Sequence, residues 1–185
     1  MNLNENAAIV VELVRRLSDR GGWCGAAHLQ KTACFLKHLT GVPMDFEFIL
    51  YKHGPFSFDL RSELSYLLAQ GLLRRELNEP PYGSSLRPGP RAHLLMDRYR
   101  GAVERYDRQI EFIAERLADK GVVELERLGT ALWVTDAMPE RTPEERATEM
   151  VRLKPHIERA DALSAVRDVD EMRREWAAAG KAPEA

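Results

Sequence analysis

Two cysteines and two histidines near the N-terminus come closest to the spacing of a metal site. They follow the pattern C-x3-H-x5-C-x3-H, at Cys24, His28, Cys34 and His38. Thiolate and imidazole are ligands that zinc prefers, but a structural site needs four of them converging on one ion. All four residues fall in or beside a single predicted helix, where positions 24 and 34 would lie about 15 Å apart along the axis. We therefore expect no metal ion here, and a Cys34 that is simply buried.

His53 and Ser57 are the second candidate for chemistry, because an imidazole and a hydroxyl flank one turn. General base catalysis needs the base within hydrogen-bond reach of the nucleophile. No glycine-rich elbow, phosphate loop or paired acidic motif accompanies these residues, and the Ser57 oxygen is expected to cap a helix. Cys24 follows two glycines, but no feature of the sequence would lower its pKa and make it reactive. The sequence thus predicts a protein that is not an enzyme and carries no cofactor.

Arginines in and after a predicted third helix could contact the phosphates of duplex DNA. The predicted contacts are Arg61, Arg74, Arg75, Arg87 and Arg91. Binding that neutralises several phosphates requires several cations close together, and four of the five arginines fall in a predicted β-hairpin. The helix itself presents Asp59 and Glu63 beside Arg61, so its charge disfavours base reading. We expect the hairpin arginines to lead any contact with DNA.

A second group of side chains favours binding to a protein. The predicted partner contacts are Tyr51, Lys52, His53, Phe56 and Tyr82. Aromatic side chains supply much of the binding energy of protein interfaces, and these lie beside a predicted turn and at the tip of the predicted hairpin. The leading interpretation is a DNA-binding, transcription-type regulator whose contacts are led by the hairpin arginines, and the alternative is a protein-partner adaptor of antitoxin-like type that does not bind DNA.

Two helices and a strand are predicted to precede these residues. Apolar residues at three- and four-residue spacing predict helices over 6–19 and 25–39. The segment 46–51 alternates instead, with Phe46 and Phe48 on one face, which is typical of a short strand. Gly-Gly and Gly-Val-Pro sequences end the two helices, because a helix C-terminus favours glycine where φ turns positive.

The Gly54-Pro55 turn is predicted to lead the strand directly into a third helix over 57–70. Ser57 is its expected N-cap, and Asp59 lies in the first turn, where the helix dipole favours an anion. A stripe of leucines then follows at helical spacing, and Gly71 ends the helix.

A β-hairpin is predicted after the third helix, with strands around 72–77 and 84–92 and a proline-rich loop between them. The resulting order is helix, helix, strand, helix, strand, strand. That order is typical of a winged helix, whose third helix and hairpin are the usual contact surfaces. Residues 1–93 are therefore predicted to form a winged helix-turn-helix domain.

The rest of the chain is predicted to be a helical lobe over 94–180, followed by a frayed tail at 181–185. A single helix of about 25 residues is expected over 94–119, with an apolar stripe that could pair with a second copy to form a homodimer. Three or four shorter helices should follow it. One of them begins at Thr142-Pro143-Glu144-Glu145, which has the residues of a capping box with proline at the first helical position. The predicted fold class is mainly α (α+β).

Three motifs make the chain resemble a known family. They are Leu29-Gln30-Lys31 in the second helix, Gly54-Pro55-Phe56-Ser57 at the turn, and Gly71-Leu72 after the third helix. With their flanking elements they resemble the YwgA-type winged-helix proteins of prokaryotes over roughly residues 7–170. The Gly-Pro-Phe-Ser turn also resembles the Panacea-type domain of antitoxins and partner-binding proteins. The resemblance implies a winged-helix fold and offers no catalytic residues.

The charge of the chain gives nucleic acid no global attraction, since the net charge is −2 over 185 residues. The two parts differ slightly. Residues 1–93 hold 11 Lys and Arg against 9 Asp and Glu, a net of +2, whereas residues 94–185 hold 16 against 20, a net of −4. This difference orients any contact with DNA toward the first part.

The composition is that of an ordinary globular protein, with 44% hydrophobic and 30% charged residues. No apolar run approaches the ~18 residues of a membrane span, and the N-terminus lacks the cationic start of a signal peptide. Two cysteines without a secretory signal indicate reduced thiols, so we expect a cytoplasmic location.

Overall fold

The computed structural model describes residues 2–77 and 83–180, and these are mainly helical with small antiparallel two-stranded sheets. The mainly α (α+β) class is therefore confirmed. The predicted loop residues Pro80, Pro81 and Tyr82, and the predicted tail at 181–185, lie outside the described residues. Within the described ranges, no helix is long and apolar enough to cross a membrane.

Helices and hairpins alternate in the first part of the chain. Its elements are α1 (Leu3–Asp19), α2 (Ala26–His38), β1 (Ile49–Tyr51), β2 (Gly54–Phe56), α3 (Phe58–Ala69), β3 (Leu73–Glu76) and β4 (Ser85–Pro88). The chain then continues with helices alone. They are α4 (Ala92–Arg98), α5 (Arg100–Arg105), α6 (Asp107–Leu117), α7 (Val122–Ala137), α8 (Pro143–Leu153) and α9 (Arg159–Ala179).

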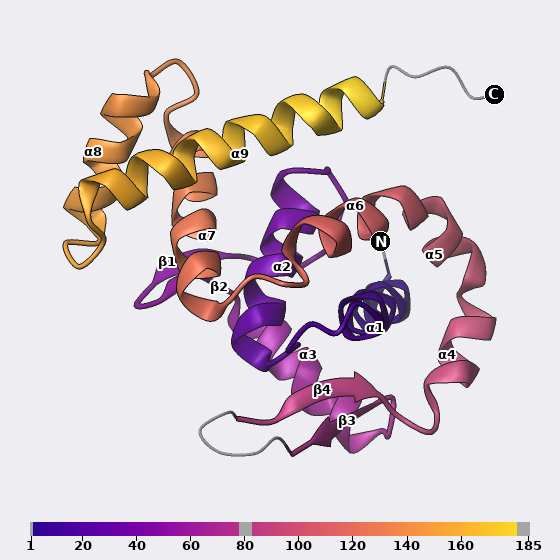
Figure 1. The fold of residues 1–185 in the computed structure, drawn as a ribbon. Helices are drawn as coiled ribbons and strands as arrows, with labels where there is room; N and C mark the ends of the chain where they lie inside the picture. The colour runs from indigo at the N-terminus through magenta and orange to yellow at the C-terminus, as the bar shows by residue number, and fades with distance from the viewer. Residues whose placement is uncertain (1, 78–82, 181–185) are drawn as a thin grey trace.

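Helix α1 lies at the centre of the first part of the molecule. A capping box fixes its start, because the Asn2 side chain accepts a hydrogen bond from the Glu5 backbone N–H and the Glu5 carboxylate accepts one from the Asn2 backbone. Every residue from Asn6 to Val14 is buried, so this stretch has no solvent face. In Figure 1 the helix is seen end-on, with α2, the arc of α4, α5 and α6, and the β3–β4 hairpin around it.

The predicted single helix over 94–119 is wrong, since this segment forms three short helices that curve around α1 (Figure 1). Helical geometry is interrupted at Tyr99 and Tyr106, where φ is −113° and −114° and nearby N–H groups bond back three residues instead of four. These tighter turns keep the segment against α1, from which a straight helix would diverge. Of the apolar stripe that suggested a homodimer, Ile110 and Ile113 are completely buried within the chain, whereas Tyr99 and Tyr106 are half-buried.

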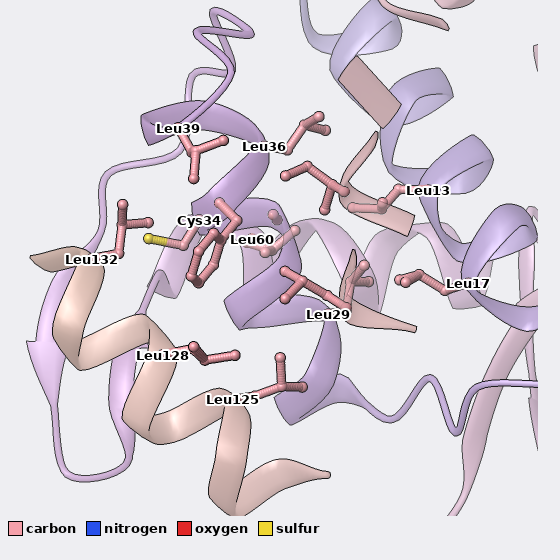
Figure 2. Close-up of a cluster of buried hydrophobic side chains, with 14 of the residues drawn as sticks. Leu13, Leu17, Leu29, Cys34, Leu36, Leu39, Leu60, Leu125, Leu128 and Leu132 are labelled. Carbon is pink, nitrogen blue, oxygen red and sulfur yellow. The ribbon is translucent and has the colours of Figure 1, made fainter. Parts of the chain in front are cut away.

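Leucines from α1, α2, α3 and α7 meet in one hydrophobic core (Figure 2). Leu29 and Leu36 of α2 lie in its middle, with Leu13 of α1 on one side and Leu128 of α7 on the other. The core therefore extends across residue 93, where the sequence predicts the end of a domain. Helices α1 and α2 join the two parts, because α4, α5 and α6 pack against α1, and α6 and α7 pack against α2.

The later helices follow their local start signals. Thr142 and Glu145 form the predicted capping box of α8, with Pro143 at the first helical position. The final stretch forms one long helix, α9, because no residue between Arg159 and Ala179 interrupts the helical backbone, and α7, α8 and α9 are within the predicted three or four shorter helices. Helix α9 packs on both α7 and α8.

The predicted strand over 46–51 is correct in its faces and wrong in its pairing. Phe46 and Phe48 are buried and Glu47 is exposed, as the alternation predicts, but pairing begins only at Ile49. The partner is β2, in the register Ile49 with Phe56 and Tyr51 with Gly54. The turn is thus Lys52-His53, and Gly54-Pro55 begins the returning strand instead of leading directly into a helix.

Gly54 makes this hairpin possible. Its φ is +86°, a left-handed conformation that other residues adopt with strain. A two-residue turn followed by a left-handed glycine is a common hairpin connection. The resulting β1–β2 hairpin lies beside α7 in Figure 1.

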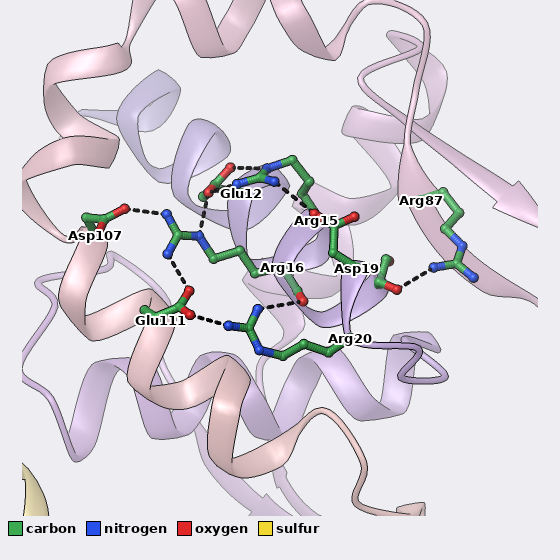
Figure 3. A network of polar contacts seen from close by, with 9 residues as sticks. Glu12, Arg15, Arg16, Asp19, Arg20, Arg87, Asp107 and Glu111 are labelled. Carbon is green, nitrogen blue, oxygen red and sulfur yellow. Dashed lines mark hydrogen bonds and ion pairs between the residues drawn. The ribbon is translucent and has the colours of Figure 1, made fainter.

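A network of ion pairs joins α1 to α6 (Figure 3). Arg16 donates to Glu12 at 2.6 Å and to Glu111 at 2.5 Å, and it also pairs with Asp107. Arg15 holds the same Glu12 carboxylate, whose side chain is only 3% exposed. Burial alone would raise the pKa of Glu12, but the hydrogen bonds and charges of the two arginines outweigh it, so the pKa lies below its ordinary value of 4.5.

Candidate functional site

The cysteines and histidines of the C-x3-H-x5-C-x3-H pattern do not converge. Cys24 and Cys34 are buried, and burial raises the pKa of both thiols, that of Cys24 to about 12. The His28 ring donates from Nε2 to the Leu117 carbonyl oxygen at 2.8 Å, while His38 lies 3.4 Å from Asp136. Among the residues that the structure describes, no group of three or more potential ligands could hold a metal ion.

His53 and Ser57 are separated by the hairpin. Ser57 is completely buried, and its Oγ accepts a hydrogen bond from the Leu60 backbone N–H at 3.2 Å, which confirms the predicted N-cap of α3. Its backbone is also held on both sides by the Gln30 amide: Gln30 donates to the Ser57 carbonyl oxygen at 2.9 Å and accepts from its N–H at 2.7 Å. His53 instead turns toward Glu126, 3.4 Å away. The two residues therefore form no nucleophile–base pair in this arrangement.

Four of the five predicted DNA-contacting arginines lie on or just after the β3–β4 hairpin, and they differ in the hydrogen bonds and ion pairs that hold their side chains. Arg87 is held by Glu76 at 2.6 Å and by the Ser18 carbonyl oxygen at 3.2 Å, and its hydrogen bond lowers the pKa of Glu76. Arg91 donates to the Gln70 carbonyl oxygen at 3.3 Å. Arg74 lies 3.6 Å from the same Glu76. Arg75, the neighbour of Arg74 on β3, is exposed.

Three aromatic rings gather at the end of the β1–β2 hairpin and the start of α3. The Phe56 ring lies 5.7 Å from that of Tyr51 and 5.1 Å from that of Phe58, and the Tyr51 and Phe58 rings are 6.0 Å apart. Tyr51 is 54% exposed and Phe58 45%. The Arg61 guanidinium lies 5.0 Å from the centre of the Phe58 ring, within the range of a cation–π contact. We call Tyr51, Phe56, Phe58 and Arg61 the aromatic surface.

The sequence predicts part of the aromatic surface. Tyr51 and Phe56 are among the predicted partner contacts, and Arg61 among the predicted DNA contacts. Phe58 is missing from the prediction because it is the first residue of α3 and lies outside the leucine stripe. The repeated Phe-Ser-Phe sequence around Ser57 was the available signal. The hairpin brings its two phenylalanines onto one surface.

A cleft of about 740 Å³ opens beside the Lys52-His53 turn. It lies between the start of α2, the turn, the first half of α7 and the segment after α8. Its walls are mostly apolar, with charged groups at the floor and rim. We call it the Lys31 cleft; the residues used below are Lys31, Lys52, His53, Val123, Glu126 and His156.

Glu126 of α7 organises the floor of the Lys31 cleft. Its carboxylate lies 3.4 Å from His53 Nδ1 and 3.0 Å from His156 Nε2, and its side chain is 13% exposed. Lys154 lies close by and donates to the backbone carbonyl oxygens of Tyr51 and, at 2.7 Å, Lys52. Burial lowers the pKa of Lys154, and the Glu126 charge opposes this. The Lys52-His53 turn is therefore held by Glu126 in the first half of α7 and by Lys154 at the end of α8.

Lys31 is the most deeply placed charge of the cleft, at 5% exposure. Its stem lies beside two glycines: a Cβ added at Gly129 would lie 3.5 Å from Lys31 Cγ, and one at Gly54 would lie 3.6 Å from Lys31 Cε, both ordinary van der Waals contacts. Burial lowers the pKa of Lys31, and the nearby charge of Glu126 partly opposes that effect. The sequence analysis missed Lys31 as a site residue, although it belongs to the Leu29-Gln30-Lys31 motif.

A second cavity of about 300 Å³ adjoins the cleft and reaches the aromatic surface. Lys31 and His53 line both cavities, and the smaller one is also lined by Tyr51, Phe56 and Arg61.

Scans against protein-family models and curated proteins return no match to the chain. The resemblance to YwgA-type proteins therefore rests on the sequence motifs.

Proposed function

We propose that the protein is a non-enzymatic regulatory protein of winged-helix type that acts by binding a protein partner through the aromatic surface. The observation that carries this proposal is the exposure of two aromatic rings, those of Tyr51 and Phe58, which contact each other and the half-buried Phe56, with an arginine stacked on Phe58. Clustered aromatic and arginine side chains are the usual anchors of protein interfaces. Exposed apolar groups gathered in one place also indicate a binding surface more strongly than scattered ones.

The winged-helix part of the proposal is supported by the order of the elements. Three helices, α1, α2 and α3, are followed directly by the β3–β4 hairpin, whose strands pair in antiparallel register from Leu73 with Pro88 to Glu76 with Ser85. The additional β1–β2 hairpin stands between α2 and α3. It enlarges the surface next to the start of α3, where the three rings lie.

Charge complementarity defines the partner that the surface would accept. Arg61 lies within the aromatic surface, and Lys52 and Lys31 lie beside it at the hairpin turn and in the adjoining cavity. We therefore infer a partner segment that combines aromatic or aliphatic side chains with Asp or Glu. A peptide of this composition would place its apolar residues on the rings and its carboxylates near the cations.

Selection from a displayed library of random peptides tests the proposal. The wild-type protein should enrich peptides that carry both apolar and acidic residues. A double variant, Tyr51→Ser with Phe58→Ser, should lose at least about tenfold of its affinity for the enriched peptides, because truncation of anchor residues commonly costs 2 kcal/mol or more, on the order of thirtyfold. Binding is measured by calorimetry with synthetic peptides.

Tyr66→Ser provides the matched control. Tyr66 is as exposed as Tyr51, at 54%. It lies on α3 about two turns after Phe58, and it has no ring contact among the described residues. This variant should bind the peptides within about twofold of the wild type. Failure to enrich any peptide, or equal binding by the double variant, would count against the proposed surface.

Binding of duplex DNA is a second candidate, and the exposure of Arg74 and Arg75 on β3 favours it. Against it stand Glu76, which holds Arg87, and the carboxylates of Asp59 and Glu63 on α3. If DNA is bound, affinity for a 20-base-pair duplex should fall steeply with salt, and Arg74→Ala with Arg75→Ala should reduce the magnitude of the salt slope by about 2. Fluorescence anisotropy at several salt concentrations measures this. Absence of binding at low salt would eliminate the candidate.

A further inference from the structure

The Lys31 ammonium lacks a partner of its own. The side chain is 5% exposed, yet Lys31 has no hydrogen-bond partner among the described residues. Its Nζ is not among the fully buried atoms that lack a hydrogen-bond partner, so the ammonium opens into the cleft, where an anion can reach it. Lys154, the other buried lysine beside Glu126, differs from Lys31 because it donates to two backbone carbonyl oxygens. Of the two lysines, Lys31 is therefore the one whose positive charge has no hydrogen-bond acceptor.

Glu126 cannot by itself compensate Lys31. Its two carboxylate oxygens are engaged by His53 on one side and by His156 on the other. Its single negative charge is also shared with Lys154, and Lys52 adds a further positive charge at the rim. Arg127 at the edge is paired separately with Asp161 at 2.7 Å. The cleft thus holds more cations than anions, with the excess at its deepest point.

The walls of the cleft indicate what kind of anion would fit. Val122 and Val123 at the start of α7 are 45% and 62% exposed, and Ile157 and Ala27 also contribute apolar surface. The volume of about 740 Å³ lies within the range of small-molecule sites. A phosphate or sulfate would leave these apolar walls uncovered, whereas a carboxylate on an apolar body would use both features.

We propose that the Lys31 cleft binds a carboxylate carried by an apolar body, with the carboxylate at Lys31 and the body against Val122, Val123 and Ile157. The carboxylate would accept a charge-assisted hydrogen bond from the ammonium. This chemistry occurs in free fatty or aryl acids and at the C-terminus of a peptide that ends in an apolar residue. The three apolar contacts of this site lie outside the aromatic surface, and Lys31, which lines both cavities, is the residue that the two proposals share.

Calorimetric titration with octanoate, and separately with octanol, tests the site. Octanol has the same apolar body without the charge, so octanoate should bind at least about tenfold more tightly. Lys31→Met preserves the length and apolar stem of the side chain and should abolish this preference. Arg105→Met, which removes an exposed cation of α5 that does not line the cleft, should change octanoate affinity by less than about threefold. Equal binding of octanoate and octanol by the wild type would overturn the proposal.

A tripeptide ending in leucine, compared with its C-terminal amide, distinguishes the source of the carboxylate. Tighter binding of the peptide acid than of octanoate assigns the site to a protein C-terminus, and the reverse assigns it to a small acid. A second measurement uses the unaltered sequence: lysines are methylated reductively with ¹³C-formaldehyde and observed by NMR. The Lys31 signal should move more than any other lysine signal on adding whichever acid binds. An unmoved Lys31 signal at saturation would contradict the proposal even if the methionine variant fails to fold.

Discussion

Replacement of Gly22 by alanine is expected to destabilise the protein by roughly 3 kcal/mol or more. A Cβ at this position would lie 2.3 Å from the Ala118 carbonyl oxygen and 2.9 Å from the Leu17 carbonyl oxygen. Both obstacles are backbone atoms at the ends of α6 and α1, so neither can move away as a flexible side chain could. The Gly22 N–H also donates to the Leu17 carbonyl oxygen at 3.2 Å, which fixes the glycine in place. The close approach of α1 and α6 therefore requires glycine.

Gly101→Ala is the matched control for this prediction. Gly101 lies within α5, and a Cβ there would meet no atom within 4 Å. Alanine should stabilise the helix by about 0.5–1 kcal/mol, because glycine loses more conformational entropy on folding. Urea unfolding followed by circular dichroism measures both changes. Equal stability of the two variants would show that α1 and α6 do not meet as closely as described.

Arg16→Met is expected to cost about 2–4 kcal/mol at neutral pH, because it removes the cation that joins Glu12 to α6. Glu12 would keep Arg15 alone while remaining buried, and Glu111 would keep only Arg20. Arg20→Met is the control. Arg20 is more exposed, at 29% against 14% for Arg16, and has one carboxylate partner, so its loss should cost less than about 1 kcal/mol.

The pH dependence of the Arg16→Met effect follows from the pKa of Glu12. In the wild type this pKa lies below 4.5, so the ionised carboxylate contributes stability that is present above about pH 4.5 and lost as the pH falls through the folded-state pKa. Without Arg16, only Arg15 opposes the effect of burial, so the pKa of Glu12 should be higher in the variant than in the wild type, and protonation at low pH should cost the variant less stability. The stability difference should therefore shrink between pH 7 and pH 4. A difference that is constant over this range, measured by urea unfolding, would contradict the described network.

Local signals predicted the starts of several helices correctly. Ser57 caps α3 and Thr142 caps α8, because a cap depends on residues within one turn. The burial of Phe46 and Phe48 also followed from alternation alone. What alternation could not predict was the strand partner. The β2 strand arises only because Gly54 turns the chain back, whereas the local sequence predicted Gly54-Pro55 only as the turn before α3.

Long-range packing accounts for the errors in the second part of the chain. The apolar spacing over 94–119 was continuous, and neither Tyr99 nor Tyr106 is a helix-breaking residue. The breaks come from wrapping the segment around α1, which its own sequence does not specify. The Lys31 cleft was missed for the same reason. Its floor joins Lys31, Glu126 and His156, which are far apart in sequence and become neighbours only when α7 packs on α2.

The central claim is that the exposed rings beside the first hairpin bind a protein segment. Its most direct test is the ratio of dissociation constants for one enriched apolar-acidic peptide, measured by calorimetry with the wild type and with the Tyr51→Ser, Phe58→Ser variant. Circular dichroism of both proteins establishes that the variant is folded. The proposed function predicts a ratio of at least about ten, with Tyr66→Ser remaining within about twofold of the wild type. A ratio near one in the folded double variant would contradict it.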